Sequence, residues 1–192
     1  MLKQDRRRLH RDVGECLEQA LAGNIDEFAP ILARHFDEAG DDARAVDYLS
    51  RAAESASRRY ASREAIALLD RALTVALRGG ATGAMIADLS TRAGRLREMA
   101  GDHEAALATY DALEALATER ADTASICQAF LARAAIFCAP TSRFDAARGL
   151  KEANEALRLS IETGNRAGEA RAHWLILLVS KFNQEPLRGL QS

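Results

Sequence analysis

The chain has 192 residues, a length that allows one ordinary domain or a short array of repeats. Its 26 basic and 28 acidic residues leave a formal net charge of −2, which argues against a general attraction to nucleic acid or to an anionic membrane. Forty residues are alanine and only three are proline, so the composition predicts an all-helical chain packed through small side chains.

The first predicted helix covers residues 2–21 and has an apolar face along Leu9, Val13 and Leu17. A basic cluster lies on the opposite face and consists of Lys3, Arg6, Arg7, Arg8 and Arg11. This cluster could bind the phosphate groups of nucleic acid or contact a preceding domain. No aromatic side chain is interleaved with it for base stacking, so we favour a solvated face and predict no direct binding of nucleic acid.

Turn and capping signals divide the rest of the chain into further helices. Asn24 begins a capping-box pattern before a helix that ends at Gly40, and Ser62 and Ser142 are predicted to cap later helices. The predicted helices then cover residues 42–59, 62–77, 84–100, 103–118, 122–138, 142–162 and 167–182. The helix at 122–138 is apolar on almost every side, which predicts that it is buried on several faces.

An acidic residue followed by alanine recurs at the start of alternate helices. Glu64, Glu104 and Asp145 occupy these positions, 40 and then 41 residues apart. A supersecondary unit that returns at a fixed period is typical of a solenoid, here built from antiparallel helix pairs. We therefore predict an N-terminal helical pair at 1–41, repeats at 42–183 with the last one incomplete, and a C-terminal tail at 184–192.

The helix predicted at 167–182 is unusual because it carries six consecutive apolar residues, 174–179. The last helix of a finished solenoid has a polar outer face. Either the chain is cut from a longer one, which we favour, or this surface meets a second copy of the chain. The two explanations are compatible. Trp174, Leu175 and Leu178 are the residues that we expect to drive self-association.

Cysteines, histidines and apolar runs indicate no chemistry of their own. Cys16, Cys127 and Cys138 are too scattered for a disulfide framework or a zinc site, and we expect Cys127 and Cys138 to share a buried face. No two histidines have metal-ligand spacing. We predict no catalytic residue, metal or cofactor. Without a signal peptide or an apolar run long enough to cross a membrane, the chain is expected to be cytoplasmic and to have no membrane partner.

The repeats resemble those of the tetratricopeptide-repeat family. The best match is residues 101–107, Gly-Asp-His-Glu-Ala-Ala-Leu, with Tyr110, and Gly40-Asp41 with Ala45 matches as well. The period near 40 and several N-terminal segments resemble the helical segment that follows the ATPase module in bacterial adenylate-cyclase-like and LuxR-type regulators. These segments are 8–15, 33–36, 39–41, 43–53 and 60–61. The resemblance implies a right-handed superhelix and a sensor or interaction role within a larger signalling or transcriptional regulator.

A stack of helix pairs would offer its first helices as a concave surface for a peptide or a helix. The polar residues expected there are Arg92, Arg95, Gln128 and Arg133, although such arginines can also be solvated or salt-bridged. The sequence thus predicts a non-enzymatic scaffold that binds a protein, a peptide or other domains of its parent protein. The alternative is a homodimerisation module that uses the apolar C-terminal helix.

Overall fold

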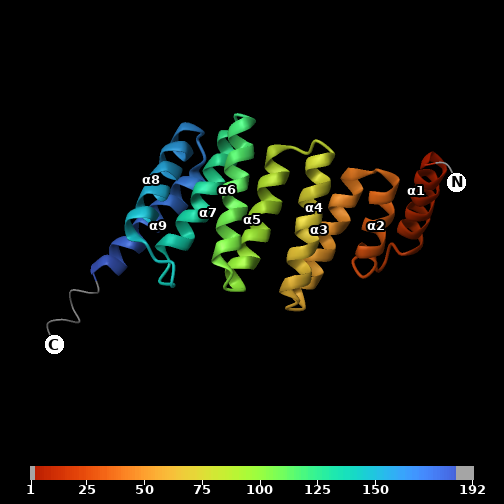
Figure 1. Ribbon diagram of the computed structural model, residues 1–192, viewed down its shortest axis with the longest axis horizontal. Coiled ribbons are helices and arrows are strands. Elements are labelled where there is room, and N and C mark those ends of the chain that lie inside the picture. The colour runs from red at the N-terminus through yellow and green to blue at the C-terminus, as the bar shows by residue number, and fades with distance from the viewer. Residues whose placement is uncertain (1–2, 185–192) are drawn as a thin grey trace. The chain divides into compact units, whose positions relative to one another are not determined.

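The structure is a computed structural model that describes residues 3–184, and all regular secondary structure in that range is helical (Figure 1). The helices are α1 (Lys3–Ala20), α2 (Ala29–Ala39), α3 (Asp42–Arg58), α4 (Ser62–Arg78), α5 (Gly83–Met99), α6 (His103–Glu119), α7 (Thr123–Cys138), α8 (Ala146–Glu162) and α9 (Arg166–Gln184). This confirms the prediction of an all-α chain with about nine helices. The predicted tail at 184–192 lies outside the described residues, apart from Gln184 at the end of α9.

The chain divides into two compact units, Met1–Leu96 and Arg97–Ser192. In the first unit α1, α2, α3 and α4 pack in consecutive order, and Leu89 and Ala93 of α5 join their core. In the second unit α6, α7, α8 and α9 pack in the same manner, and α9 also contacts α7. The predicted boundary at residue 41 falls inside the first unit, between two helices that pack on each other.

The first residues of alternate helices repeat with about the same period as the sequence motif. Helices α3, α5, α7 and α9 begin at residues 42, 83, 123 and 166, which gives steps of 41, 40 and 43 residues. Consecutive helices therefore alternate between first and second members of a repeated pair. The right-handed winding and the tetratricopeptide identity stay predictions from the resemblance.

Most of these helices end at a residue with left-handed backbone conformation. The residues are Gly40, Tyr60, Gly80, Gly101, Ala121 and Gly164, and the first five are 20 or 21 positions apart. At each of them the next residue donates its N–H to the carbonyl five residues back, as from Asp41 to Phe36 at 2.9 Å. This hydrogen bond satisfies a carbonyl that the helix end would otherwise leave without a partner.

The residue that follows the left-handed position then caps the next helix in several turns. Asp41, Asp102 and Asp122 each accept a hydrogen bond from the backbone N–H three residues later, at 3.0 to 3.1 Å. Asp145 and Asn165 do the same for α8 and α9. A single residue therefore helps to close one helix and starts the next, which keeps most connections short.

The three predicted caps are wrong. Residues 21–28 form turns, and α2 begins only at Ala29, where Pro30 fits the first turn because the N–H it lacks has no helical partner there. Ser62 lies inside α4, whose N-cap Ala61 makes no side-chain hydrogen bond. Ser142 lies in a loop, since Asp145 both accepts from Arg148 N–H and donates its own N–H to the carbonyl of Phe137.

Small residues allow the helices of the second unit to approach closely. A Cβ atom on Gly149 of α8 would lie 2.8 Å from Cys138 Sγ of α7, and one on Gly168 of α9 would lie 2.5 Å from Ser160 Oγ of α8. Cys127 and Cys138 are both fully buried in one core with residues of α8 and α9, so their predicted shared face is confirmed. Close packing of this kind leaves no room for an added methyl group.

The left-handed turns generate a stability prediction. Gly101 has φ +81° and no atom within 4 Å of the place that a methyl group would occupy, so Gly101→Ala introduces only backbone strain and should lower the free energy of unfolding by about 1 kcal/mol. Ala121, with φ +52°, already carries that strain, so Ala121→Gly should stabilise by up to about 1 kcal/mol. Urea unfolding measures both changes. Gly23→Ala is the control, because Gly23 also has open space around it but no left-handed backbone.

Candidate functional site

Arg133 on α7 is the predicted peptide-binding residue whose surroundings differ most from the prediction. Its side chain is only 4% exposed, and its guanidinium lies between carboxylates of α6 and α8. Nε and Nη2 each contact Glu152 at 2.9 Å, and Nη1 lies 2.5 Å from Glu114 and 3.1 Å from Asp111. With its polar atoms engaged in this way, Arg133 ties three helices together and has no free face for a peptide.

The ionic cluster around Arg133 also determines its charge state. Burial alone would lower the pKa of Arg133, but Glu152 and Glu114 raise it, so the side chain stays protonated. The guanidinium also lies over the ring of Phe130, 4.9 Å from its centroid. Removing one member of such a buried cluster would leave the opposite charge buried without a partner, which makes the cluster a structural connection.

The other predicted peptide-binding residues have different environments. Arg92 donates to the carbonyl of Ser50 at 3.3 Å and pairs with Asp88 at 3.4 Å, so it ties α5 to α3. Arg95 and Gln128 are exposed on α5 and α7. Arg92 and Arg95 belong to the first unit, and Gln128 and Arg133 belong to the second.

A second ionic network joins α1 to α3. Arg44 contacts Glu15 at 2.9 Å, Glu18 at 3.4 Å and Asp41 at 2.7 Å, and its guanidinium lies over the ring of Phe36. Tyr48 donates its hydroxyl to Glu18. The apolar pattern of α3 does not indicate that a polar network covers one side of this helix.

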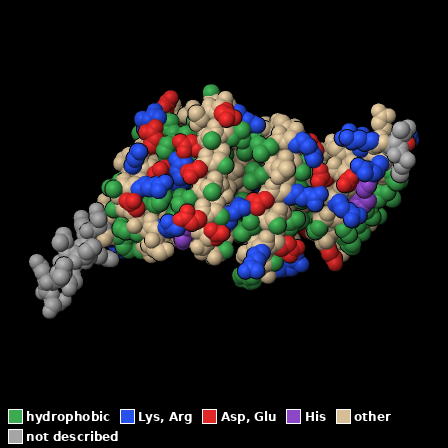
Figure 2. Space-filling model, in the orientation of Figure 1, with side chains coloured by type: hydrophobic (Ala, Val, Ile, Leu, Met, Phe, Trp, Pro, Cys, Tyr) green, Lys and Arg blue, Asp and Glu red, His purple; other side chains and the backbone are tan. Residues whose placement is uncertain are grey.

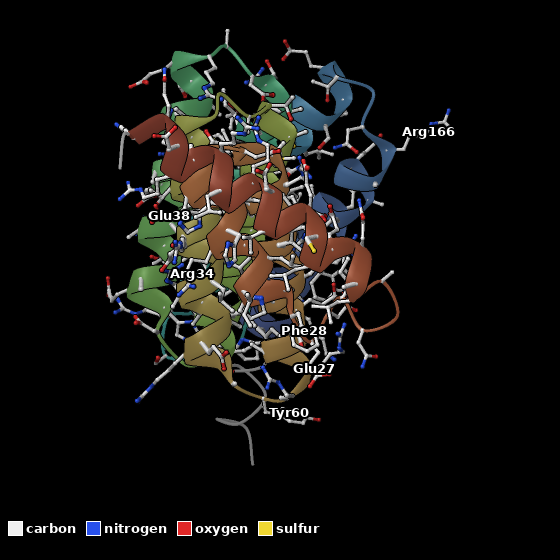
Figure 3. All side chains as sticks on the ribbon, turned by 90° about the vertical axis from the view of Figure 1, so that its right-hand side faces the viewer. Glu27, Phe28, Arg34, Glu38, Tyr60 and Arg166 are labelled. Carbon is white, nitrogen blue, oxygen red and sulfur yellow. The ribbon has the colours of Figure 1, made fainter. Side chains whose placement is uncertain are left out.

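The basic cluster of α1 stays on the surface. Figure 2 shows lysine and arginine side chains gathered with histidine over α1 and α2. Arg6 and Arg8 have acidic neighbours, Glu38 at 3.7 Å and Asp12 at 3.9 Å, which are long contacts between exposed groups. Figure 3, which views α1 from outside, shows Glu38 on the same side of α2 as Arg34. The acidic neighbours support the interpretation of a solvated face.

Two histidines, His10 of α1 and His35 of α2, lie against each other. The rings of His10 and His35 have their centroids 5.1 Å apart, and both Nδ1 atoms are buried without a hydrogen-bond partner in the described part of the chain. Burial lowers the pKa of His35, and the charges of His10 and Arg34 lower it further. A proton on His35 is therefore unfavourable in the folded chain.

Helix α9 carries apolar side chains on more than one side. Leu175 is fully buried against the helices of its own unit, so its side chain is not exposed for the self-association that we predicted, and Leu178 is partly buried against the same core. Trp174 is 58% exposed, and Leu177, which the sequence reasoning did not select, is 69% exposed. The helical period separates these sides, because residues 174 and 177 lie on one face and residue 175 lies on another.

Few other features of the described residues could hold a ligand. No group of three or more His, Cys, Asp or Glu side chains within residues 3–184 is arranged to hold a metal ion. A shallow hollow of about 210 Å³ lies where the turn after α4 meets α3, and its lining includes Val46, Ala76 and Met85. Among the described helices, none is long and apolar enough to cross a membrane.

Comparison with known proteins does not identify a family. No protein-family model matches the chain, and no curated protein matches it significantly. The resemblance to tetratricopeptide repeats consequently depends on the sequence pattern described above.

The Arg133 cluster predicts a large effect of a single substitution. Arg133→Met leaves Glu152 buried without its cation and should lower the free energy of unfolding by about 3 kcal/mol. Adding Glu152→Gln should recover part of the loss, since the unpaired charge is removed. Arg158→Met is the matched control on α8, because its partners within residues 3–184, Glu155 and Glu162, are more exposed, and the change should affect stability very little. Equal losses for Arg133→Met and Arg158→Met in urea unfolding would contradict the assignment.

The lowered pKa of His35 predicts a dependence of stability on pH. In the unfolded chain His35 has the ordinary histidine pKa of 6.5, and in the folded chain its pKa is lower. The contribution of His35 to the free energy of unfolding is therefore complete above pH 6.5 and is lost as pH falls through the folded pKa. His35→Gln should therefore flatten the fall in unfolding free energy between about pH 7 and about pH 5. Arg34→Gln should move the NMR titration of the His35 ring upward. A ring that titrates above its ordinary value in the wild-type chain contradicts the prediction.

Proposed function

We propose that this chain is a non-catalytic interaction module that binds another protein through the surface of its helices. In this proposal it is a cytoplasmic, tetratricopeptide-like segment of a larger bacterial signalling or transcriptional regulator. The repeated helix starts at 40 to 43 residue steps support the repeat character. The resemblance of the N-terminal segments supports the regulatory context.

The observation that carries the proposal is the contrast between the polar and the apolar side chains. The guanidinium groups of Arg44 and Arg133 form ion pairs that join helices of the same unit. Large apolar side chains on α9, Trp174 and Leu177, are instead mostly exposed. Exposed apolar surface on a helix typically marks a site where another protein binds.

Self-association is the second candidate function, because the same two side chains could meet their copies across a two-fold axis. Sedimentation velocity over a wide range of concentrations distinguishes the candidates. A monomer at every concentration rejects the dimer, whereas a dimer that Trp174→Glu dissociates supports it.

Selection from a displayed library of helical peptides tests the interaction role directly. Selection against the full chain should enrich peptides that bind with dissociation constants of about 100 μM or below, as measured by calorimetry. Failure to enrich any peptide over an immobilised, unrelated helical protein contradicts the proposal. Turnover of a nucleotide or an ester by the purified chain contradicts its non-catalytic part.

A further inference from the structure

Two apolar sides of α9 have different surroundings. Ala172, Leu175 and Val179 are fully buried in the core of the second unit. Ala170, Trp174 and Leu177 follow each other at spacings of four and three residues, so they form a stripe on another side, and all three are exposed. We call Ala170, Trp174 and Leu177 the outer stripe.

A comparison with α7 indicates what such a stripe does in this fold. Asp122 and Asn165 cap α7 and α9 through the same hydrogen bond to the N–H three residues later, which aligns the two helices at an offset of 43 residues. Under that alignment the outer stripe corresponds to Cys127, Leu131 and Ala134 of α7. All three of these residues are buried in the core that α7 forms with α8 and α9.

Small residues of α8 lie against α7, next to Cys127 and Cys138. Cys127 Sγ lies 3.4 Å from the carbonyl oxygen of Ala156 and 3.2 Å from Ser160 Oγ, and Gly149 lies directly against Cys138. The buried line of α8 continues through Ala153. A helix that presents glycine, alanine or serine at spacings of four and three residues can therefore pack closely on a stripe of this kind.

Basic side chains around the outer stripe limit which helix can bind there. Arg166 and Lys181 continue its line at the two ends, and Arg171 and His173 lie beside it. Arg166, Arg171, His173 and Lys181 are exposed, and Arg166 projects away from the helices (Figure 3). The acidic residue of α9 is Glu169, which is half-buried. Two copies of α9 placed face to face would bring these basic side chains together, whereas a helix with acidic flanks would be attracted.

We propose that the outer stripe of α9 is the docking site for an acidic amphipathic helix of another protein, which packs on α9 as α8 packs on α7. The partner helix presents small residues to Trp174 and Leu177, and its aspartate or glutamate side chains pair with Arg166, Arg171 and Lys181. This inference depends on the proposed interaction function and names its partner by chemistry.

Two synthetic helical peptides test the proposal. Both carry the stripe Gly-x-x-x-Ala-x-x-Ala-x-x-x-Ser taken from α8, one with glutamate and the other with lysine at the flanking positions. Trp174 is the only tryptophan of the chain, so its fluorescence reports binding at the stripe. The glutamate peptide should bind to the full chain, shift the emission to shorter wavelength, and bind at least about tenfold more tightly than the lysine peptide. Added salt should weaken its binding.

Substitutions separate a specific site from general attraction. Leu177→Glu and the double change Arg171→Glu with Lys181→Glu should each reduce binding of the glutamate peptide by about tenfold or more. Met99→Glu is the control for an exposed apolar residue outside the stripe and should leave binding unchanged. Circular dichroism checks that each variant is folded, and Leu177 is exposed enough for this substitution to be tolerated.

The possible results distinguish this inference from the proposed function. Equal binding of both peptides overturns the requirement for an acidic partner. Library-selected peptides that bind equally well to the wild-type chain and to Leu177→Glu overturn the site while the interaction function stands. If the chain forms a dimer that Leu177→Glu dissociates but the glutamate peptide does not, a second copy of the chain occupies the stripe, and the proposal is overturned. A library that yields no binder removes the interaction function itself.

Discussion

The left-handed residue at the end of a helix is the constraint on which the rest of this structure depends. The residue after it donates its N–H to a carbonyl near the helix end that would otherwise have no partner. That donor is often an aspartate whose side chain caps the following helix. The chain thereby reverses direction within very few residues. Because this happens about every 20 residues from Gly40 to Ala121, the helices from α3 to α6 each have 17 residues.

Ionic groups between helices add specificity to packing that is otherwise made from small residues. Alanine stripes fit against one another in several registers, since each residue presents nearly the same shape. Arg133 and Arg44 each engage carboxylates from neighbouring helices, so a shift along the helix axis would separate charges that are partly or fully buried. Arg133 is therefore only 4% exposed, whereas Arg44 keeps about a third of its side chain (34%) at the surface.

Sequence reasoning predicted the helices well because apolar residues at helical spacing, glycine and aspartate all indicate local structure. It failed where the outcome depended on another helix. The sequence around Arg133 would be the same whether its side chain faced solvent or Glu152. Its environment depends on the register at which α8 packs on α7. In the run from Trp174 to Val179 every residue is apolar, so the pattern could not show that Leu175 is buried while Leu177 is exposed. The predictions for Ser62 and Ser142 failed because we expected serine to cap helices that begin after Ala61, which makes no side-chain hydrogen bond, and after Asp145.

The predominance of contacts between helices that are consecutive in the sequence has a consequence for how the chain folds. Each helix in a unit meets mainly the one before it and the one after it in sequence, so few distant segments must find each other. Loop closure then costs little entropy, and folding of such chains is fast. During synthesis each new helix leaves the ribosome after the helix that it packs on, so the chain can fold while it is being made.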